Sequence, residues 1–128
     1  MPVEIERLEP DIFLLHWIGD IGVKDLAASH AETTAITTAD GIDRYVHIIS
    51  TAELGKIPAD AIGARQVLID YSNVIALLMI DSPTIIRILT RTVNSITPQV
   101  AIETHSDLEA AKARAYTLLG RDEAQEQV

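Results

Sequence analysis

The sequence predicts a single α/β domain with a mostly parallel, mixed five-stranded sheet and helices on both of its faces. Apolar runs of strand length alternate with helical patterns, which indicates parallel strands joined by crossover helices. The first two strand-like runs are the exception, because the turn between them is long enough only for an antiparallel hairpin. The predicted order is ββαβαβαβα over residues 1–128, with residues 120–128 as a flexible tail.

The composition supports one core and excludes several kinds of site and partner. Of the 128 residues, 48% are hydrophobic, which suits one domain without a metal or disulfide to hold it. Cysteine is absent, so thiol catalysis and cysteine-ligated zinc are excluded, and a cytoplasmic protein is expected. A net charge of −9 disfavours nucleic acid and anionic membrane surfaces. No secretory signal opens the chain, and its longest apolar run, residues 74–80, is too short to span a bilayer.

Residues 3–9 and 12–20 form the predicted hairpin. The first run alternates apolar with charged side chains, which is typical of an exposed edge strand. The second run is rich in branched and aromatic residues and is expected to be more buried. The turn between them contains Pro10, which cannot continue a strand ladder.

A helix is predicted over residues 22–40. Gly41 follows it and provides a C-terminal stop, because glycine readily takes the left-handed backbone conformation found there. Its threonines are poor helix formers, so tertiary packing must hold it. The side chains expected on its inner face are Leu26, Ala27, His30, Ala31 and Thr34.

The centre of the predicted sheet comes from the next two strands. The third strand covers residues 44–50 and is followed by a loop over residues 51–56. Pro58 begins the second helix, since its fixed backbone angle suits the first helical turn. The fourth strand, residues 73–81, is apolar on both faces, as expected for a central strand covered by helices on each side.

The remaining elements carry recognisable helix starts. Ser82 caps the third helix, and residues 99–104 form the fifth strand. Ser106 and Glu109 have the spacing of a capping box and predict the start of the last helix. The inner face of that helix is predicted to carry Leu108, Ala111, Ala115, Leu118 and Leu119.

This order of elements resembles the anti-sigma-factor-antagonist (STAS) family over residues 3–119. The likeness is carried by "YVHIIS" before a loop and a helix, "DSP" after the fourth strand, and "SDLEAAKARAYTLL" as the terminal helix. It implies a STAS-like fold and a bacterial, cytoplasmic, non-enzymatic regulatory module that binds a protein partner without a cofactor. The expected interaction surface is the loop and helix over residues 50–64.

The resemblance also marks a difference from the family. STAS proteins carry an Asp-Ser-Ser-Gly type motif at the start of the helix after the third strand, where phosphorylation of a serine controls partner binding. The matching residues 58–62 read Pro-Ala-Asp-Ala-Ile, so the phosphorylatable serine is missing. Asp60 offers a fixed negative charge there, although an anion near a helix N-terminus is favoured by roughly 0.3–1 kcal/mol without any signalling role.

Polar side chains gather where the predicted parallel strands end. Ser50 and Thr51 end the third strand, Ser82 follows the fourth, and His105 follows the fifth. Open α/β sheets bind ligands at this edge, so these residues define an alternative function, a small-molecule or lipid-binding domain. A serine paired with His105 would also suit nucleophilic catalysis, but the G-x-S-x-G motif of serine hydrolases is absent.

Two further groups of residues have a functional and a structural interpretation. His16 and His47 lie on neighbouring predicted strands, but no third ligand occurs at metal-binding spacing, so packed histidines are expected. Arg87 and Arg91 lie one helical turn apart and are candidates for binding an anion or a partner's carboxylate, with a solvated helix face as the simpler interpretation. The first strand offers an edge for a homo-oligomer, although its charged side chains oppose pairing.

Overall fold

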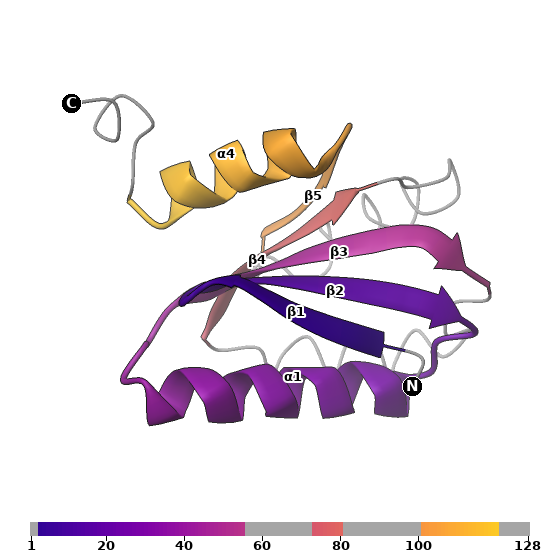
Figure 1. Cartoon of the computed structure of the whole chain (residues 1–128), viewed down its shortest axis with the longest axis horizontal. Coiled ribbons are helices and arrows are strands. Elements are labelled where there is room, and N and C mark those ends of the chain that lie inside the picture. The colour runs from indigo at the N-terminus through magenta and orange to yellow at the C-terminus, as the bar shows by residue number, and fades with distance from the viewer. Residues whose placement is uncertain (1–2, 56–72, 81–100, 121–128) are drawn as a thin grey trace.

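The protein's computed structural model describes residues 3–55, 73–80 and 101–120. Within them, five strands form one sheet in the order β1-β2-β3-β4-β5, with α1 on one face and α4 on the other (Figure 1). β1 is antiparallel to β2, and the other neighbouring pairs are parallel. The elements are β1 Val3–Glu9, β2 Ile12–Gly19, α1 Val23–Ala39, β3 Tyr45–Leu54, β4 Val74–Ile80, β5 Ala101–His105 and α4 Leu108–Leu118.

This arrangement confirms the predicted α/β class and the mixed, mostly parallel sheet with helices on both faces. The second and third predicted helices and the predicted tail lie outside the described residues. Neither helix in the described part of the chain is long and apolar enough to cross a membrane.

The central strands are buried on both faces, as the sequence predicts. Alternate side chains of each strand point to opposite sides of a sheet, so the same strands supply two cores. On the α1 side the core consists of Phe13, Leu15, Tyr45, Ile49, Val74, Leu77, Met79 and Ile102. On the α4 side it consists of Ile12, Leu14, Val46, Ile48, Ala76, Leu78 and Ile80, with Ala111 and Ala115 of α4.

The β1–β2 hairpin forms as predicted and is fastened to the end of α1. The Arg7 guanidinium lies 5.7 Å from the centre of the Phe13 ring and forms an ion pair of 2.6 Å with Asp40. It also donates hydrogen bonds to the Pro10 carbonyl oxygen. One arginine therefore connects the edge strand, the hairpin turn and the C-terminal end of α1.

The inner face of α1 differs from the prediction. Ala27 and Ala31, expected to face the sheet, are exposed, and Leu26, His30 and Thr34 are only partly buried. The fully buried side chains are instead hydroxyl-bearing, namely Ser29, Thr33 and Thr37.

This rotation of α1 has a physical reason, which is that each buried hydroxyl has a hydrogen-bond partner. Ser29 and Thr37 donate to carbonyl oxygens of their own helix. Thr33 reaches the sheet, where its Oγ1 atom lies 2.9 Å from His47 Nε2. Burying a hydroxyl costs little folding free energy when the hydroxyl is hydrogen-bonded. α1 can therefore pack through its hydroxyl face and leave its alanines in solvent.

His47 is the centre of a buried polar network on β3. Its side chain is 1% exposed, and its ring centre lies 5.5 Å from that of Tyr45. The Tyr45 hydroxyl lies 2.8 Å from Thr34 Oγ1 and 3.3 Å from Thr33 Oγ1. Burial, assisted by the nearby His30, lowers the pKa of His47 from 6.5 to about 3, so its imidazole is neutral at neutral pH.

β3 is longer than predicted. The sequence places its end at Ser50, whereas the strand continues to Leu54. The extension exists because β2 also continues past an irregularity in its pairing, so that Ile18 pairs with Glu53 and Gly19 with Leu54. The predicted loop therefore begins as strand, and Ser50 lies inside β3.

α4 begins one residue later than its predicted cap implies. The N-cap is Asp107 rather than Ser106, and its carboxylate accepts a 2.9 Å hydrogen bond from the Ala110 backbone N–H. Asp is as good an N-cap as Ser, so the local sequence does not distinguish them. The predicted inner face is confirmed, since Ala111 and Ala115 are buried and the three leucines pack against the same core.

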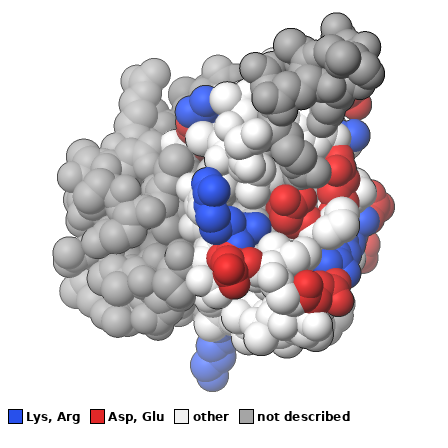
Figure 2. All heavy atoms as spheres, turned by 90° about the vertical axis from the view of Figure 1, so that its left-hand side faces the viewer, with Lys and Arg blue, Asp and Glu red and all other residues white. Residues whose placement is uncertain are grey.

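The C-terminal end of α4 is tied to the hairpin and to the start of β3. The Tyr116 hydroxyl donates a hydrogen bond to the Glu9 carboxylate, and the Arg44 guanidinium donates one of 3.1 Å to the Leu118 carbonyl oxygen. Figure 2 shows this side of the molecule, where acidic and basic side chains of the described residues are interspersed. Arg44 and Glu9 thus serve contacts within the chain.

The buried neutral state of His47 predicts how stability depends on pH. Between pH 6.5 and about 3 the unfolded chain binds a proton at this residue and the folded chain does not. The free energy of unfolding should therefore fall as the pH is lowered through this window, by up to about 1.4 kcal/mol per pH unit for one proton. Urea denaturation at several pH values measures this slope.

The variant His47→Gln provides the comparison for this prediction. It removes the titrating group, so its unfolding free energy should depend less steeply on pH over the same window, even if the variant is less stable throughout. Equal slopes for the two proteins would show that His47 does not contribute.

Candidate functional site

The carboxyl ends of the parallel strands carry a row of polar side chains on the α4 face. Strand pairing aligns His16 with Ser50, Ser50 with Ile80, and Ile80 with His105. In the preceding row Leu14, Ile48 and Leu78 are apolar core residues on β2, β3 and β4, and Glu103 continues the row on β5. The sheet surface thus changes from apolar to mostly polar at this edge, which is where open α/β sheets bind ligands.

Ser50 and His105 lie in the same row but are not neighbours. β4 runs between their strands, so two strand spacings of roughly 5 Å each separate their backbones. That separation is too large for the direct hydrogen bond that a serine nucleophile and its base require. The strand neighbour of Ser50 is His16 instead, and no hydrogen bond joins these two within the described residues.

Thr51 has a structural role in this arrangement. Its side chain is 3% exposed, and its Oγ1 donates a 3.1 Å hydrogen bond to the Ile80 carbonyl oxygen. This bond ties β3 to β4 near their carboxyl ends. A buried hydroxyl engaged in this way is a poor candidate for a nucleophile or a modification site.

The segments that follow β2 and β3 are in close contact at this edge. The Gly55 N–H donates a 2.7 Å hydrogen bond to the Gly19 carbonyl oxygen. A Cβ atom at Gly55 would lie 2.5 Å from Asp20 Oδ1 and 3.0 Å from the Gly19 carbonyl carbon, so a side chain there would displace Asp20 and crowd the Gly19 backbone. Around this contact, the exposed residues are Gly19, Asp20, Ala52, Glu53 and Gly55.

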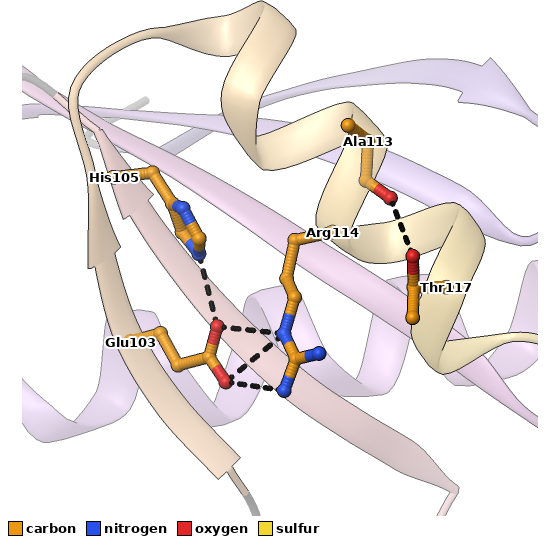
Figure 3. Close-up of polar contacts among 5 residues, drawn as sticks. All are labelled: Glu103, His105, Ala113, Arg114 and Thr117. Carbon is orange, nitrogen blue, oxygen red and sulfur yellow. Dashed lines mark hydrogen bonds and ion pairs between the residues drawn. The ribbon is translucent and has the colours of Figure 1, made fainter. Parts of the chain in front are cut away.

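A second group of polar side chains joins β5 to α4, and we call it the Glu103–His105–Arg114 cluster (Figure 3). Glu103 Oε1 lies 3.0 Å from His105 Nε2. The Arg114 guanidinium donates from Nε and Nη2 to both carboxylate oxygens, at distances of 3.0 to 3.2 Å. The side chains are only partly buried, with exposed fractions of 29% for Glu103, 20% for His105 and 40% for Arg114.

The cluster shifts the pKa of Glu103 and of Arg114. The Arg114 guanidinium, with a smaller contribution from His105, holds the pKa of Glu103 below its usual value, against partial desolvation, which acts in the opposite direction. Glu103 in turn raises the pKa of Arg114. Because an ionised carboxylate can only accept hydrogen bonds, His105 must donate from Nε2, and its neutral form then carries the lone pair on Nδ1.

Glu103 and Arg114 are not among the site residues that the sequence predicts. A signal for Glu103 exists, since residues two apart on a strand share a face and His105 is itself a candidate. No sequence pattern indicates Arg114, because its place beside Glu103 depends on how α4 lies across β5.

The two strand histidines do not share a site. His47 is in register with Phe13 and points to the α1 side, whereas His16 is in register with Ser50 and lies on the α4 side. Among the described residues, no three His, Asp or Glu side chains are grouped in a way that could hold a metal ion. The predicted site residues Asp60, Ser82, Arg87 and Arg91 lie outside the described part of the chain.

Comparison with known proteins identifies the fold. No family profile matches the sequence, and no curated protein matches it. An uncharacterised Shewanella loihica protein with a SpoIIAA-like fold has a TM-score of 0.57 at 19% identity over 86% of this chain and 90% of its own. The unphosphorylated anti-sigma factor antagonist SpoIIAA has a TM-score of 0.54 at 8% identity, over 88% and 96%. The phosphorylated form of SpoIIAA, a Bacillus cell fate determinant, has 0.53 at 10%, over 86% and 96%.

The contrast between Thr51 and Ser50 gives a test of which hydroxyl is structural. Thr51→Val should lower the free energy of unfolding by about 1–3 kcal/mol, because it removes a buried donor from the Ile80 carbonyl oxygen. Thr51→Ser keeps that donor and should lose less. Ser50→Ala, which removes a hydroxyl without a described hydrogen bond, should change stability by under about 1 kcal/mol. Urea denaturation of the three variants measures these differences. A larger loss of unfolding free energy for Ser50→Ala than for Thr51→Val contradicts this assignment.

Proposed function

We propose that this chain, which has the SpoIIAA-like fold, is a single-domain, non-enzymatic regulatory module that acts by binding another protein. The observation that carries the proposal is the likeness to an anti-sigma factor antagonist over 88% of the chain. The side-chain geometry is consistent with it, since Ser50 and His105 are too far apart to act as nucleophile and base, and Thr51 is engaged in a structural hydrogen bond. A cytoplasmic location belongs to the proposal and agrees with the absence of cysteine.

The surface proposed for partner binding is the edge formed by the segments after β2 and β3. Its exposed residues include the acidic side chains of Asp20 and Glu53. The chain as a whole carries a net charge of −9, so a partner with a basic surface is favoured over nucleic acid or an anionic membrane. The remainder of the predicted surface, residues 56–64, lies outside the described residues.

Binding through this surface is proposed to be independent of serine phosphorylation at the family position. Residues 58–62 contain no serine or threonine, so no hydroxyl is available there to accept a phosphoryl group. The protein would therefore bind its partner without being phosphorylated at this position.

Affinity capture with paired charge reversals tests this function. Glu53→Arg places a positive charge on the proposed surface, while Glu32→Arg makes the same change on the exposed side of α1. A protein partner should be retained by the unchanged chain and by Glu32→Arg, and Glu53→Arg should weaken its binding roughly tenfold or more, as expected when a rim charge is reversed. Quantitative mass spectrometry of the bound proteins, followed by titration with the purified partner, gives the ratio. Retention of no protein by the unchanged chain contradicts the proposal.

Self-association through β1 is a further part of the proposal, since this strand ends the sheet order. Glu4 and Glu6 are exposed on it and would face like charges in a symmetric strand pair, so a dimer should be weak at low salt and strengthened by screening. Light scattering across a concentration series measures it.

A second candidate function is the binding of a small molecule or lipid at the carboxyl ends of the strands. It is favoured by the row of His16, Ser50 and His105, which follows a row that is apolar on β2, β3 and β4. Native mass spectrometry of the purified protein would reveal a retained molecule, and its loss in Ser50→Leu would locate it at this row.

A further inference from the structure

The geometry of the Glu103–His105–Arg114 cluster leaves one nitrogen of His105 with an available lone pair. Glu103 occupies Nε2 through a 3.0 Å hydrogen bond and thereby fixes the tautomer. No hydrogen bond reaches Nδ1 from the described residues. Since a carboxylate that holds one imidazole nitrogen makes the other more basic and orients the ring, Nδ1 is a candidate nucleophile.

Arg114 supplies a second feature, which is a positive charge beside Glu103. Its Nε and Nη2 atoms bond Glu103, while Nη1 makes no hydrogen bond among the described residues (Figure 3). Arg114 also balances the charge of Glu103, so an incoming anion does not meet an unpaired carboxylate.

Accessibility separates His105 from the buried histidine. His105 is 20% exposed, and Arg114 is 40% exposed, so a small molecule can reach the cluster. His47 is only 1% exposed and its Nε2 is engaged with Thr33. Of the two, His105 alone combines solvent access with an unoccupied nitrogen.

We propose that His105 accepts a phosphoryl group on Nδ1 from a small phosphoramidate or acyl phosphate. The Nδ1 lone pair forms the new bond to phosphorus, and the bond from phosphorus to the donor's nitrogen or oxygen breaks. The departing ammonia or carboxylate takes that electron pair. The positive charge that develops on the ring is balanced by Glu103, whose carboxylate accepts the hydrogen bond from the Nε2 proton. The product is a phosphoimidazole on β5.

The same contacts also anchor α4 to β5, so the test must separate reactivity from packing. Incubation of the full-length protein with potassium phosphoramidate at neutral pH provides the probe. Intact mass and tandem mass spectrometry then map the label, and phosphoimidazole is recognised because it survives alkali and is lost in acid. In the unchanged protein His105 should be labelled first, at a rate at least roughly tenfold above that of His16, which no carboxylate of the described residues hydrogen-bonds.

Variants test whether the Glu103 carboxylate causes the fast labelling of His105. His105→Gln should abolish the fast label, Glu103→Gln should slow it roughly tenfold, and Glu103→Asp, which keeps the charge, should recover part of the rate. Glu109→Gln is the matched control, since it makes the same change at an exposed position of α4 outside the cluster, and it should leave the rate unchanged. Circular dichroism confirms that each variant is folded.

Either of two results overturns the proposal. One is that His16 is labelled as fast as His105 in the unchanged protein, a result that does not depend on any variant being folded. The other is an unaltered rate in folded Glu103→Gln. His105 lies on β5, two strands from β3 and its proposed partner surface, so failure of this test leaves partner binding by that surface unaffected.

Discussion

The burial of β3 and β4 from both sides is the constraint on which the rest of the structure depends. Every side chain of β3 from Tyr45 to Thr51 is buried. A strand that is apolar on one face is held in register by that face, but a strand buried on both faces lacks this signal. Buried polar groups supply part of this signal here, because a one-residue slip would separate the Thr51 hydroxyl from the Ile80 carbonyl oxygen.

The same constraint explains the unusual packing of α1. With His47 and Tyr45 pointing from β3 into the α1 side, the helix must bring hydrogen-bond partners to them. Thr33 and Thr34 do so, and the helix consequently buries its hydroxyls and exposes its alanines. Leaving the imidazole unpaired in an apolar core would cost more than burying bonded hydroxyls. The position of α1 is thus set by polar complementarity rather than by an apolar stripe.

The grouping of polar residues at the carboxyl edge of the sheet follows from the parallel pairing of the buried strands. Parallel pairing through β2 to β5 brings His16, Ser50 and His105 into one row, although they are far apart in the sequence. The fold is shared with SpoIIAA, and residues 58–62 of this chain contain no serine. Among the described residues, a polar cluster lies on the α4 face, where Arg114 of α4 meets Glu103 of β5.

The sequence by itself determined the class of fold, all five strands within a few residues, and α1 and α4. The alternation of apolar runs with capped helical patterns is local information, so it can be recognised without knowing which segments pack together. It also placed Ser50 and His105 near the carboxyl ends of their strands. Three features depended on contacts between distant segments and were decided only by the tertiary structure. β3 reaches Leu54 because β2 continues alongside it and pairs with it. α1 turns Thr33 and Thr34 toward His47 and Tyr45 because these buried groups need hydrogen-bond partners. The Glu103–His105–Arg114 cluster forms because α4 packs beside β5.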